Sequence, residues 1–147
     1  METTQQYINC SITANITARE AFEKISHVSR WWISNVEGKS ANPGDIFTVS
    51  LGTTWVTFKL VEVVPEKKVV WEITDCFLPW LNDKTEWTGS RIIWNVQRAN
   101  GGVEISFTHT LAPEMECFNQ CEKAWTAYIK ESLFNYIKEG KGMPNKF

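Results

Sequence analysis

The dipeptide Asn100-Gly101 restricts the fold of this chain more than any other feature, because it separates two stretches of alternating side chains. Asn-Gly is the strongest two-residue signal for a β-hairpin. A turn at this point sets Trp94 opposite Phe107 on an apolar face and leaves mostly polar residues on the other face. A slip of one residue would mix the two faces, so the pattern predicts that 90–98 pairs with 102–111 in this register.

More strands are predicted before this hairpin. Residues 8–14 alternate between apolar and polar side chains, as a half-buried strand does. Apolar and β-branched residues predict further strands at 46–51, 54–64 and 67–74, with a tight turn that begins at Pro65. The chain therefore contains a run of strands that are close enough in sequence to pair antiparallel.

Helical signals flank these strands. Thr17 and Glu20 form a capping box, which predicts a short helix through about Ser26, and Ser29 is expected to cap a second short helix. From Cys117 to Glu139, apolar residues recur at the helical period. A helix of about 23 residues is roughly 35 Å long, so it would cross a whole small domain.

The order of these elements predicts one α+β domain over residues 1–147. We expect a helix-grip fold, in which a curved antiparallel sheet of six to seven strands wraps on the long C-terminal helix and two short helices follow the first strand. A length of 147 residues fits a single domain. The eight tryptophans indicate either a bulky core or an aromatic-lined cavity between sheet and helix.

Composition argues against several classes of partner. The formal net charge is −2, whereas binding to nucleic acid or to an anionic membrane surface favours a basic face. No apolar run approaches the roughly 20 residues of a membrane span. The polar start of the chain, 1–6, predicts no signal peptide, so we expect a cytoplasmic protein with reduced cysteines.

Short motifs recur along nearly the whole chain in a characteristic order and spacing. They are Ile16–Phe22, Trp31-Trp32, Glu62–Pro65, Val69–Trp71, Ile105–His109, and Trp125 with Leu133 and Gly140 in the last helix. In this order they resemble the START-like (helix-grip) superfamily, and especially its branch named after the activator of the heat-shock chaperone ATPase. The resemblance implies a cavity for an apolar ligand, and the name of the branch adds a co-chaperone as a candidate function.

The residues expected to line the cavity are those of the predicted inner faces. They are Phe58, Trp71, Trp94, Phe107, Phe118 and Trp125, together with the polar residues Glu62 and His109. Broad rings make good walls for a ligand cavity, but the same rings could instead fill a packed core. The sequence leaves both alternatives open.

His109 and Glu62 are the titratable residues expected on the inner face. His109 falls opposite Ile92, where it is either a polar contact for a ligand or a core histidine satisfied by a neighbour. Glu62 shares the apolar face if the hairpin at Pro65 is regular, and there its pKa would be raised. Alternatively, Glu62 lies in water at a rim or beyond a bulge.

Cys117 and Cys121 are four residues apart, so they share one face of the predicted helix. Neither His27 nor His109 stands at a metal-ligand spacing from them. We therefore expect a core or surface role for these cysteines, with no metal and no cofactor.

The segment Asp75–Thr88 joins two predicted strands and is much longer than the usual hairpin loop of two to five residues. It carries Phe77, Trp80 and Leu81, whose apolar side chains need a burial partner. That partner is the mouth of the cavity, a second subunit or a client protein. We expect a lid over the cavity mouth, with a dimer contact as the alternative.

Three functions remain open. The aromatic interior and the lack of a recognisable catalytic set favour non-enzymatic binding of a small apolar or aromatic molecule. A protein-interaction module of the co-chaperone kind would instead expose a contiguous apolar patch to a second copy or a chaperone-type partner. An enzyme of the cyclase or hydratase kind would need Glu62 and His109 to converge in one pocket. The fold alone does not decide among them.

Overall fold

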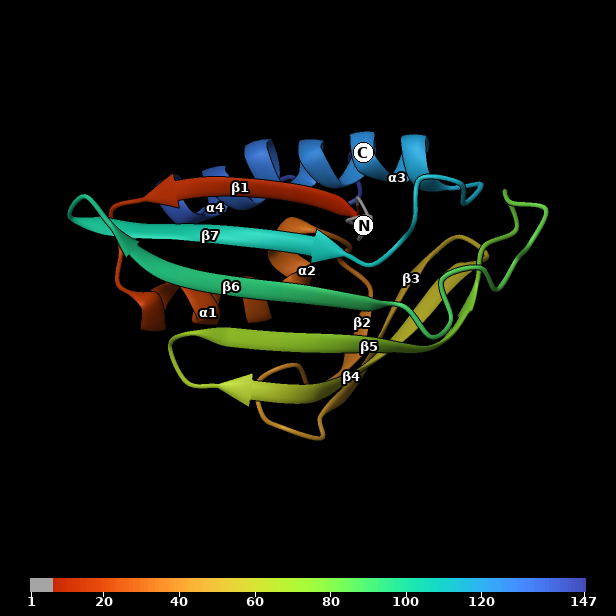
Figure 1. The fold of residues 1–147 in the computed structure, drawn as a ribbon, viewed down its shortest axis with the longest axis horizontal. Helices are drawn as coiled ribbons and strands as arrows, with labels where there is room; N and C mark the ends of the chain where they lie inside the picture. Colours follow the sequence, from red (N-terminus) through yellow and green to blue (C-terminus); the bar gives the residue numbers. More distant parts are fainter. Residues whose placement is uncertain (1–6) are drawn as a thin grey trace, which may run out of the picture.

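A computed structural model describes residues 7–147 of the chain. Its centre is one antiparallel sheet of seven strands (Figure 1). The strands are β1 (Ile8–Ala14), β2 (Val36–Gly38), β3 (Ile46–Leu51), β4 (Thr54–Val64), β5 (Lys68–Phe77), β6 (Arg91–Ala99) and β7 (Gly102–His109). Their order in the sheet is β1-β7-β6-β5-β4-β3-β2, so consecutive strands are neighbours except that β1 pairs with β7.

The helices pack on one face of this sheet, and the last three elements form one continuous rod beside β1 (Figure 1). They are α1 (Ala18–Ser26), α2 (Val28–Trp31), α3 (Phe118–Ala127), the π-helical stretch η1 (Tyr128–Leu133) and α4 (Phe134–Glu139). The rod ends at Gly140, which takes the left-handed conformation that favours glycine. The predicted α+β helix-grip fold is confirmed.

The hairpin at Asn100-Gly101 has the predicted register. Trp94 lies opposite Phe107 and Ile92 lies opposite His109. Asn100 and Gly101 both have positive φ, as a two-residue hairpin turn of the favoured type requires. The apolar side chains of both strands are consequently buried against the helices.

The β4–β5 hairpin is less regular than predicted. Its register shifts between Leu60 and Glu62, so that Leu60 lies opposite Trp71 while Glu62 lies opposite Val70. A bulge inserts one extra residue and reverses which side chains face inward. The expectation that Glu62 shares the inner face is wrong for this reason. Its side chain is 47% exposed and pairs with Lys68 at 3.6 Å.

Other differences are local. The capping box of Thr17 and Glu20 is present, but α2 begins at Val28, so Ser29 does not cap it. Strand β5 continues to Phe77, three residues beyond its predicted end, and the short strand β2 was not predicted. The long helix also contains the unpredicted π-helical stretch, where Ser132 is fully buried together with its apolar neighbours.

Candidate functional site

Aromatic rings fill the middle of the molecule, between the sheet and the helices. The ring centroids of Trp71 and Trp94 are 5.6 Å apart, those of Trp94 and Phe107 5.0 Å, and those of Phe107 and Trp125 4.7 Å. Phe58 contacts the other side of Trp71 at 5.5 Å. All five side chains are at most 2% exposed. The rings expected around a cavity are therefore brought together as a packed core.

Two pockets lie at opposite ends of this ring core. The first, of about 360 Å³, lies between α1 and the β4–β5 turn, and Trp71 forms part of its wall. The second, of about 340 Å³, lies between β3, β4, the C-terminal helix and the segment Leu78–Thr88, and Trp125 forms part of its wall. We call them the hairpin pocket and the lid pocket, and we call Leu78–Thr88 the lid segment. Phe118 is partly buried and lines neither of these pockets.

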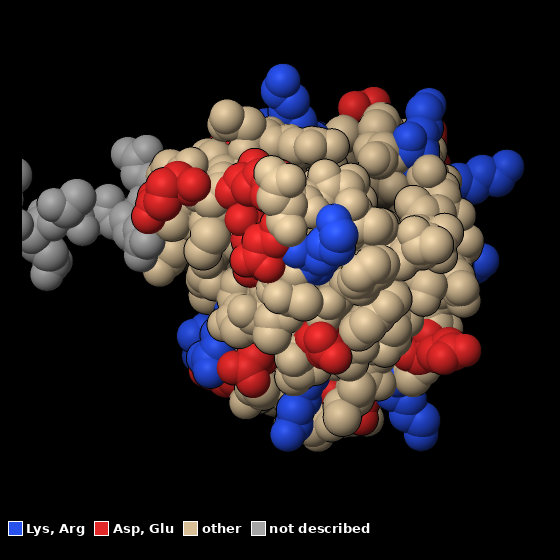
Figure 2. Space-filling model, turned by 90° about the vertical axis from the view of Figure 1, so that its right-hand side faces the viewer, with Lys and Arg blue, Asp and Glu red and all other residues tan. Residues whose placement is uncertain are grey.

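The lid pocket is the better candidate for a functional site, because it lies between sheet and C-terminal helix and its walls are mainly apolar. Val49 and Val56 come from the sheet, Trp125 and Tyr128 from the helix, and Leu78, Trp80 and Trp87 from the lid segment. Three of its lining residues are apolar and exposed, namely Leu51, Trp80 and Phe147. Figure 2 looks onto this end of the molecule and shows a mainly uncharged surface with one basic side chain near its centre, an acidic one below it, and other acidic side chains gathered toward one side.

The lid segment is an ordered loop that buries most of its apolar residues. Leu78, Leu81 and Trp87 are at most 6% exposed, whereas Trp80 is 44% exposed. The loop closes on itself, because the Leu78 amide donates to the Lys84 carbonyl at 2.7 Å. The Lys84 ammonium in turn donates to the carbonyl of Leu81 at 2.9 Å. Of the predicted lid residues, Trp80 is at the pocket mouth, Leu81 is in the core and Phe77 is the last residue of β5.

Two carboxylates fasten the lid segment to the start of α3. The Glu86 carboxylate accepts hydrogen bonds from the backbone amides of Glu116 and Cys117, at 3.0 and 2.9 Å. In the opposite direction, the Glu116 carboxylate accepts from the amide of Asn82 at 3.0 Å. Carboxylates at a helix N-terminus satisfy amides that have no partner within the helix. We call this reciprocal arrangement the carboxylate clamp. Neither glutamate was recognised from the sequence.

His109 is buried inside a complete chain of hydrogen bonds. The Trp125 indole N–H donates to Nδ1 of His109 at 3.2 Å, so the imidazole proton is on Nε2, which faces Ser90 Oγ at 3.0 Å. Ser90 Oγ in turn donates to the Trp87 carbonyl. Burial lowers the pKa of His109 to about 3, so the ring is neutral. His109 is thus a core histidine satisfied by its neighbours.

Glu62 and His109 do not converge. Glu62 is near the end of β4 beside Lys68, whereas His109 ends β7 at the other end of the sheet (Figure 1). Both imidazole nitrogens of His109 already have partners. The interpretation of these two residues as an acid–base pair of a cyclase or hydratase is therefore wrong.

Three indole N–H groups of the interior lack a hydrogen-bond acceptor among the described residues. They belong to Trp71, Trp87 and Trp94. Trp71 lines the hairpin pocket and Trp87 lines the lid pocket. A buried donor without a partner costs free energy. The nitrogen atoms of all three groups are covered by protein atoms, so they do not open into either pocket.

The residues after α4 return to the lid pocket. The Met143 amide donates to the buried hydroxyl of Ser132 at 2.6 Å, and the Asn145 amide donates to the Trp32 carbonyl at 2.7 Å. Phe147 then lies on Tyr128, with the ring centroids 5.3 Å apart. These contacts place the Phe147 ring in the wall of the lid pocket.

Comparison with known proteins identifies the family of this chain. Residues 20–138 match the family described as activator of Hsp90 ATPase homolog 1-like protein. The chain belongs to this family. No curated protein sequence matches the chain.

Solved structures share the fold of this AHSA1-type domain at low sequence identity. The Aha1 dimer from Colwellia psychrerythraea has a TM-score of 0.75 and 19% identity, over 93% of this chain and 99% of that one. The protein SSP2350 from Staphylococcus saprophyticus has a TM-score of 0.70 and 12% identity, over 94% and 96% of the two chains. The protein MLL2253 from Mesorhizobium loti has a TM-score of 0.70 and 9% identity, over 94% and 100%.

Two of the four cysteines of this AHSA1-type domain are neighbours in space. Cys117 and Cys121 meet at the start of α3, with their Cα atoms 5.4 Å apart, a separation that a disulfide can span. Cys10 and Cys76 are free. No group of three His, Cys, Asp or Glu side chains within residues 7–147 is placed to hold a metal ion. In the same range, no helix is both long and apolar enough to cross a membrane.

Proposed function

We propose that this AHSA1-type domain binds a small apolar or aromatic molecule in the lid pocket and catalyses no reaction on it. The observation that carries the proposal is the lid pocket itself, whose apolar walls come from the sheet, the C-terminal helix and the lid segment. Its volume of about 340 Å³ is within the usual range for small-molecule sites.

The lid segment supports this proposal because its rings are divided between floor and mouth. Trp87 is 6% exposed and is stacked near Trp125, with ring centroids 6.3 Å apart. Trp80 is 44% exposed and lines the mouth. A ligand entering the pocket would cover the exposed face of Trp80. The segment would then act as a lid in which Trp80 is the part that moves.

A second candidate function uses the same end of the molecule. The exposed residues Leu51, Trp80 and Phe147 form an apolar rim that a protein partner could cover. The family name suggests a chaperone as that partner, and the Colwellia psychrerythraea relative, described as a dimer, suggests a second copy.

One variant separates these candidates. Trp80→Ser removes the half-exposed ring at the pocket mouth. Trp55→Ser on β4 is the control, because Trp55 is not among the residues that line the lid pocket. We would titrate each protein with 1-anilinonaphthalene-8-sulfonate and measure its mass by native mass spectrometry, before and after extraction of bound molecules. A several-fold change in dye affinity for Trp80→Ser alone, at constant mass, supports ligand binding.

The other outcomes contradict the proposal. A change in oligomeric mass without a change in dye affinity would assign the rim to a second copy of the chain. If neither quantity changes, the lid pocket is not the dye site, and a client protein becomes the better explanation of the exposed Trp80.

A further inference from the structure

We propose that the hairpin pocket is a second ligand site, and that its ligand is a small organic cation with an aromatic or branched apolar body. This inference does not depend on the function proposed for the lid pocket, because the ring core separates the two. It rests on the apolar floor of the hairpin pocket and on the charge at its rim.

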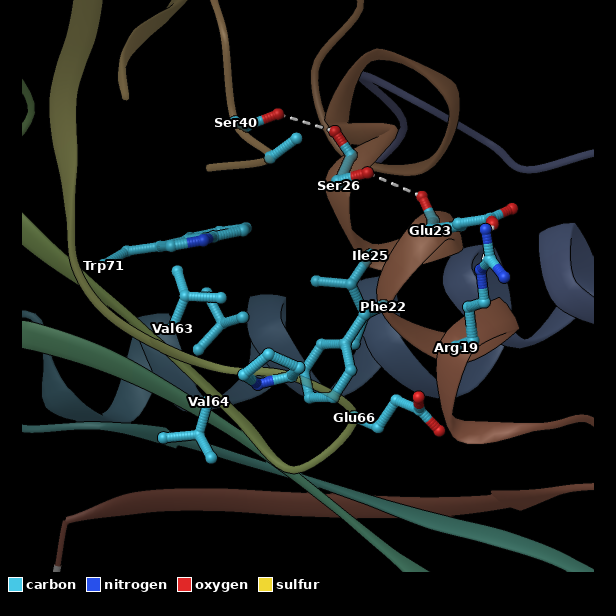
Figure 3. Close-up of a pocket in the computed structure, with 13 residues that line it drawn as sticks. Arg19, Phe22, Glu23, Ile25, Ser26, Ser40, Val63, Val64, Glu66 and Trp71 are labelled. Carbon is cyan, nitrogen blue, oxygen red and sulfur yellow. Dashed lines mark hydrogen bonds and ion pairs between the residues drawn. The ribbon is translucent and has the colours of Figure 1, made fainter. Parts of the chain in front are cut away.

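The floor is formed by two elements that meet over the ring core. Phe22 and Ile25 come from α1, and Val63 comes from β4 (Figure 3). Val69 comes from β5, the other strand of the hairpin. The bulge after Leu60 is responsible for the position of Val63, because it turns Val63 toward α1 and Glu62 toward solvent. The irregularity of this hairpin therefore supplies one wall of the pocket.

The rim is built and partly fixed by hydrogen bonds. Ser40 Oγ donates to the Ser26 carbonyl at 2.7 Å, which ties the loop before β3 to the end of α1. Ser26 Oγ donates to the Glu23 carbonyl at 2.7 Å. Both interactions are visible at the upper side of the pocket in Figure 3. These two hydrogen bonds hold the loop against the end of α1 at this side of the opening.

The charge of the rim is negative. The lining residues include Arg19, Glu23 and Glu66, which gives a formal charge of −1. Arg19 forms an ion pair with Glu23, in which Nε of Arg19 and Oε1 of Glu23 are 3.7 Å apart. Glu66 belongs to none of the ion pairs formed by residues 7–147 and is exposed at the turn. A free carboxylate next to an apolar floor favours a ligand with a cationic group and an apolar body.

Trp71 closes the inner end of the hairpin pocket with its ring. Its side chain is 1% exposed, it lines the inner end of the pocket, and its indole N–H has no acceptor among the described residues. In Figure 3 the ring extends from β5 toward Ile25 and Ser40. The nitrogen of this N–H is covered by protein atoms, so a ligand would meet Trp71 as an apolar ring surface.

The test uses two probes of similar size and opposite charge, 2-(1-naphthyl)ethylamine and 3-(1-naphthyl)propionate. Each is titrated into the full ¹⁵N-labelled chain, and amide and indole N–H signals are followed by NMR. The signal of Trp71 is assigned by its loss in Trp71→Phe. We expect the amine to shift the signals of Trp71, Val63 and Val69 saturably, and the propionate to bind there at least threefold more weakly.

Two variants locate the interaction. Glu66→Gln is expected to weaken binding of the amine about threefold, which corresponds to the contribution of a partly screened ion pair. Glu122→Gln, on the exposed side of α3, is the control and should leave this affinity unchanged. Val63→Phe fills the pocket and should abolish the shifts at Trp71, while dye binding at the lid pocket is retained. Equal affinity for both probes, shifts confined to Trp87 and Trp125, or no effect of Glu66→Gln would each overturn the proposal.

Discussion

The two ends of the space between the sheet and the helices are closed by different kinds of structure. At the hairpin pocket, a tight turn and a bulge leave a space whose rim carries Arg19, Glu23 and Glu66. At the lid pocket, an eleven-residue loop, Leu78–Thr88, folds over the opening and is fastened by the carboxylate clamp. The first end is charged and shaped by backbone register, whereas the second is uncharged at its mouth and shaped by side-chain contacts.

The difference shows that one core of packed rings can border two separate pockets. The rings from Trp71 to Trp125 are in continuous contact, so the middle of the molecule is filled and each pocket is a separate space. Stability should therefore depend on the middle, and ligand affinity on the ends. The predictions below test this division, beginning with the largest expected effect.

Truncation of the central ring should be the most damaging change. Trp94 is fully buried and contacts Trp31, Trp71 and Phe107, so Trp94→Ala is expected to lower the free energy of unfolding by about 3–5 kcal/mol. Trp80→Ala, at the lid mouth, should cost about 1–2 kcal/mol, because 44% of that residue is already exposed. Urea unfolding of both variants measures the difference. Similar losses would show that the middle and the mouth are not energetically distinct.

The buried histidine should make stability fall in acid. His109 has a pKa of about 3 in the folded chain against an ordinary value of 6.5, so below pH 6.5 the unfolded chain binds a proton that the folded chain does not. The free energy of unfolding should then fall by about 1.4 kcal/mol for each pH unit between about 6.5 and 3 because of this residue.

His109→Asn isolates this contribution, because asparagine keeps an acceptor for the Trp125 N–H but does not titrate. The variant is expected to be less stable at pH 7. Between pH 6.5 and 4.5 its free energy of unfolding should fall less steeply with decreasing pH, by the equivalent of up to one bound proton. Urea unfolding at several pH values gives both quantities. An unchanged slope would mean that His109 is not the residue that couples folding to pH.

The sequence was sufficient for the features that depend on neighbouring residues. The Asn100-Gly101 turn, the register of Trp94 with Phe107 and the capping box at Thr17 all follow from patterns a few residues long, and all are confirmed. The sequence was insufficient where the position of a side chain depends on elements that are distant in the chain. The bulge after Leu60 reverses the face of Glu62. No short pattern marks that position, and alternation alone predicts the opposite face.

The candidate site was predicted in part. Rings expected to line a cavity are indeed gathered inside, but the sequence could not distinguish a filled core from an open pocket, because this depends on how side chains from β5, β6, β7 and α3 interlock. The carboxylate clamp was missed for a similar reason. Glu86 and Glu116 are 30 residues apart, and only the folded loop brings each to the backbone of the other's segment.

Loosening the clamp should affect the lid end and leave the hairpin end unchanged. Glu86→Gln removes the charge and places an amide group against one of the two backbone N–H donors, so we expect a loss of about 1–2 kcal/mol in the free energy of unfolding. Glu114→Gln, which changes an exposed carboxylate of the same connecting segment, is the control. Hydrogen exchange should accelerate at Asn82 and Cys117 but not at Val63. Uniform acceleration would contradict a local clamp.

The smallest change tests whether the chain partly occupies its own lid pocket. Phe147 is 39% exposed and contacts Tyr128 in the pocket wall, so Phe147→Ala should cost only about 1 kcal/mol in stability. Removing the ring enlarges the apolar space open to a ligand, and we expect affinity for 1-anilinonaphthalene-8-sulfonate to rise about threefold, the equivalent of roughly 0.6 kcal/mol. Binding of 2-(1-naphthyl)ethylamine at the hairpin pocket should not change, because Phe147 is not part of its wall. A fall in dye affinity would instead show that Phe147 holds the ligand, and a change at both pockets would show that the ring core couples the two ends.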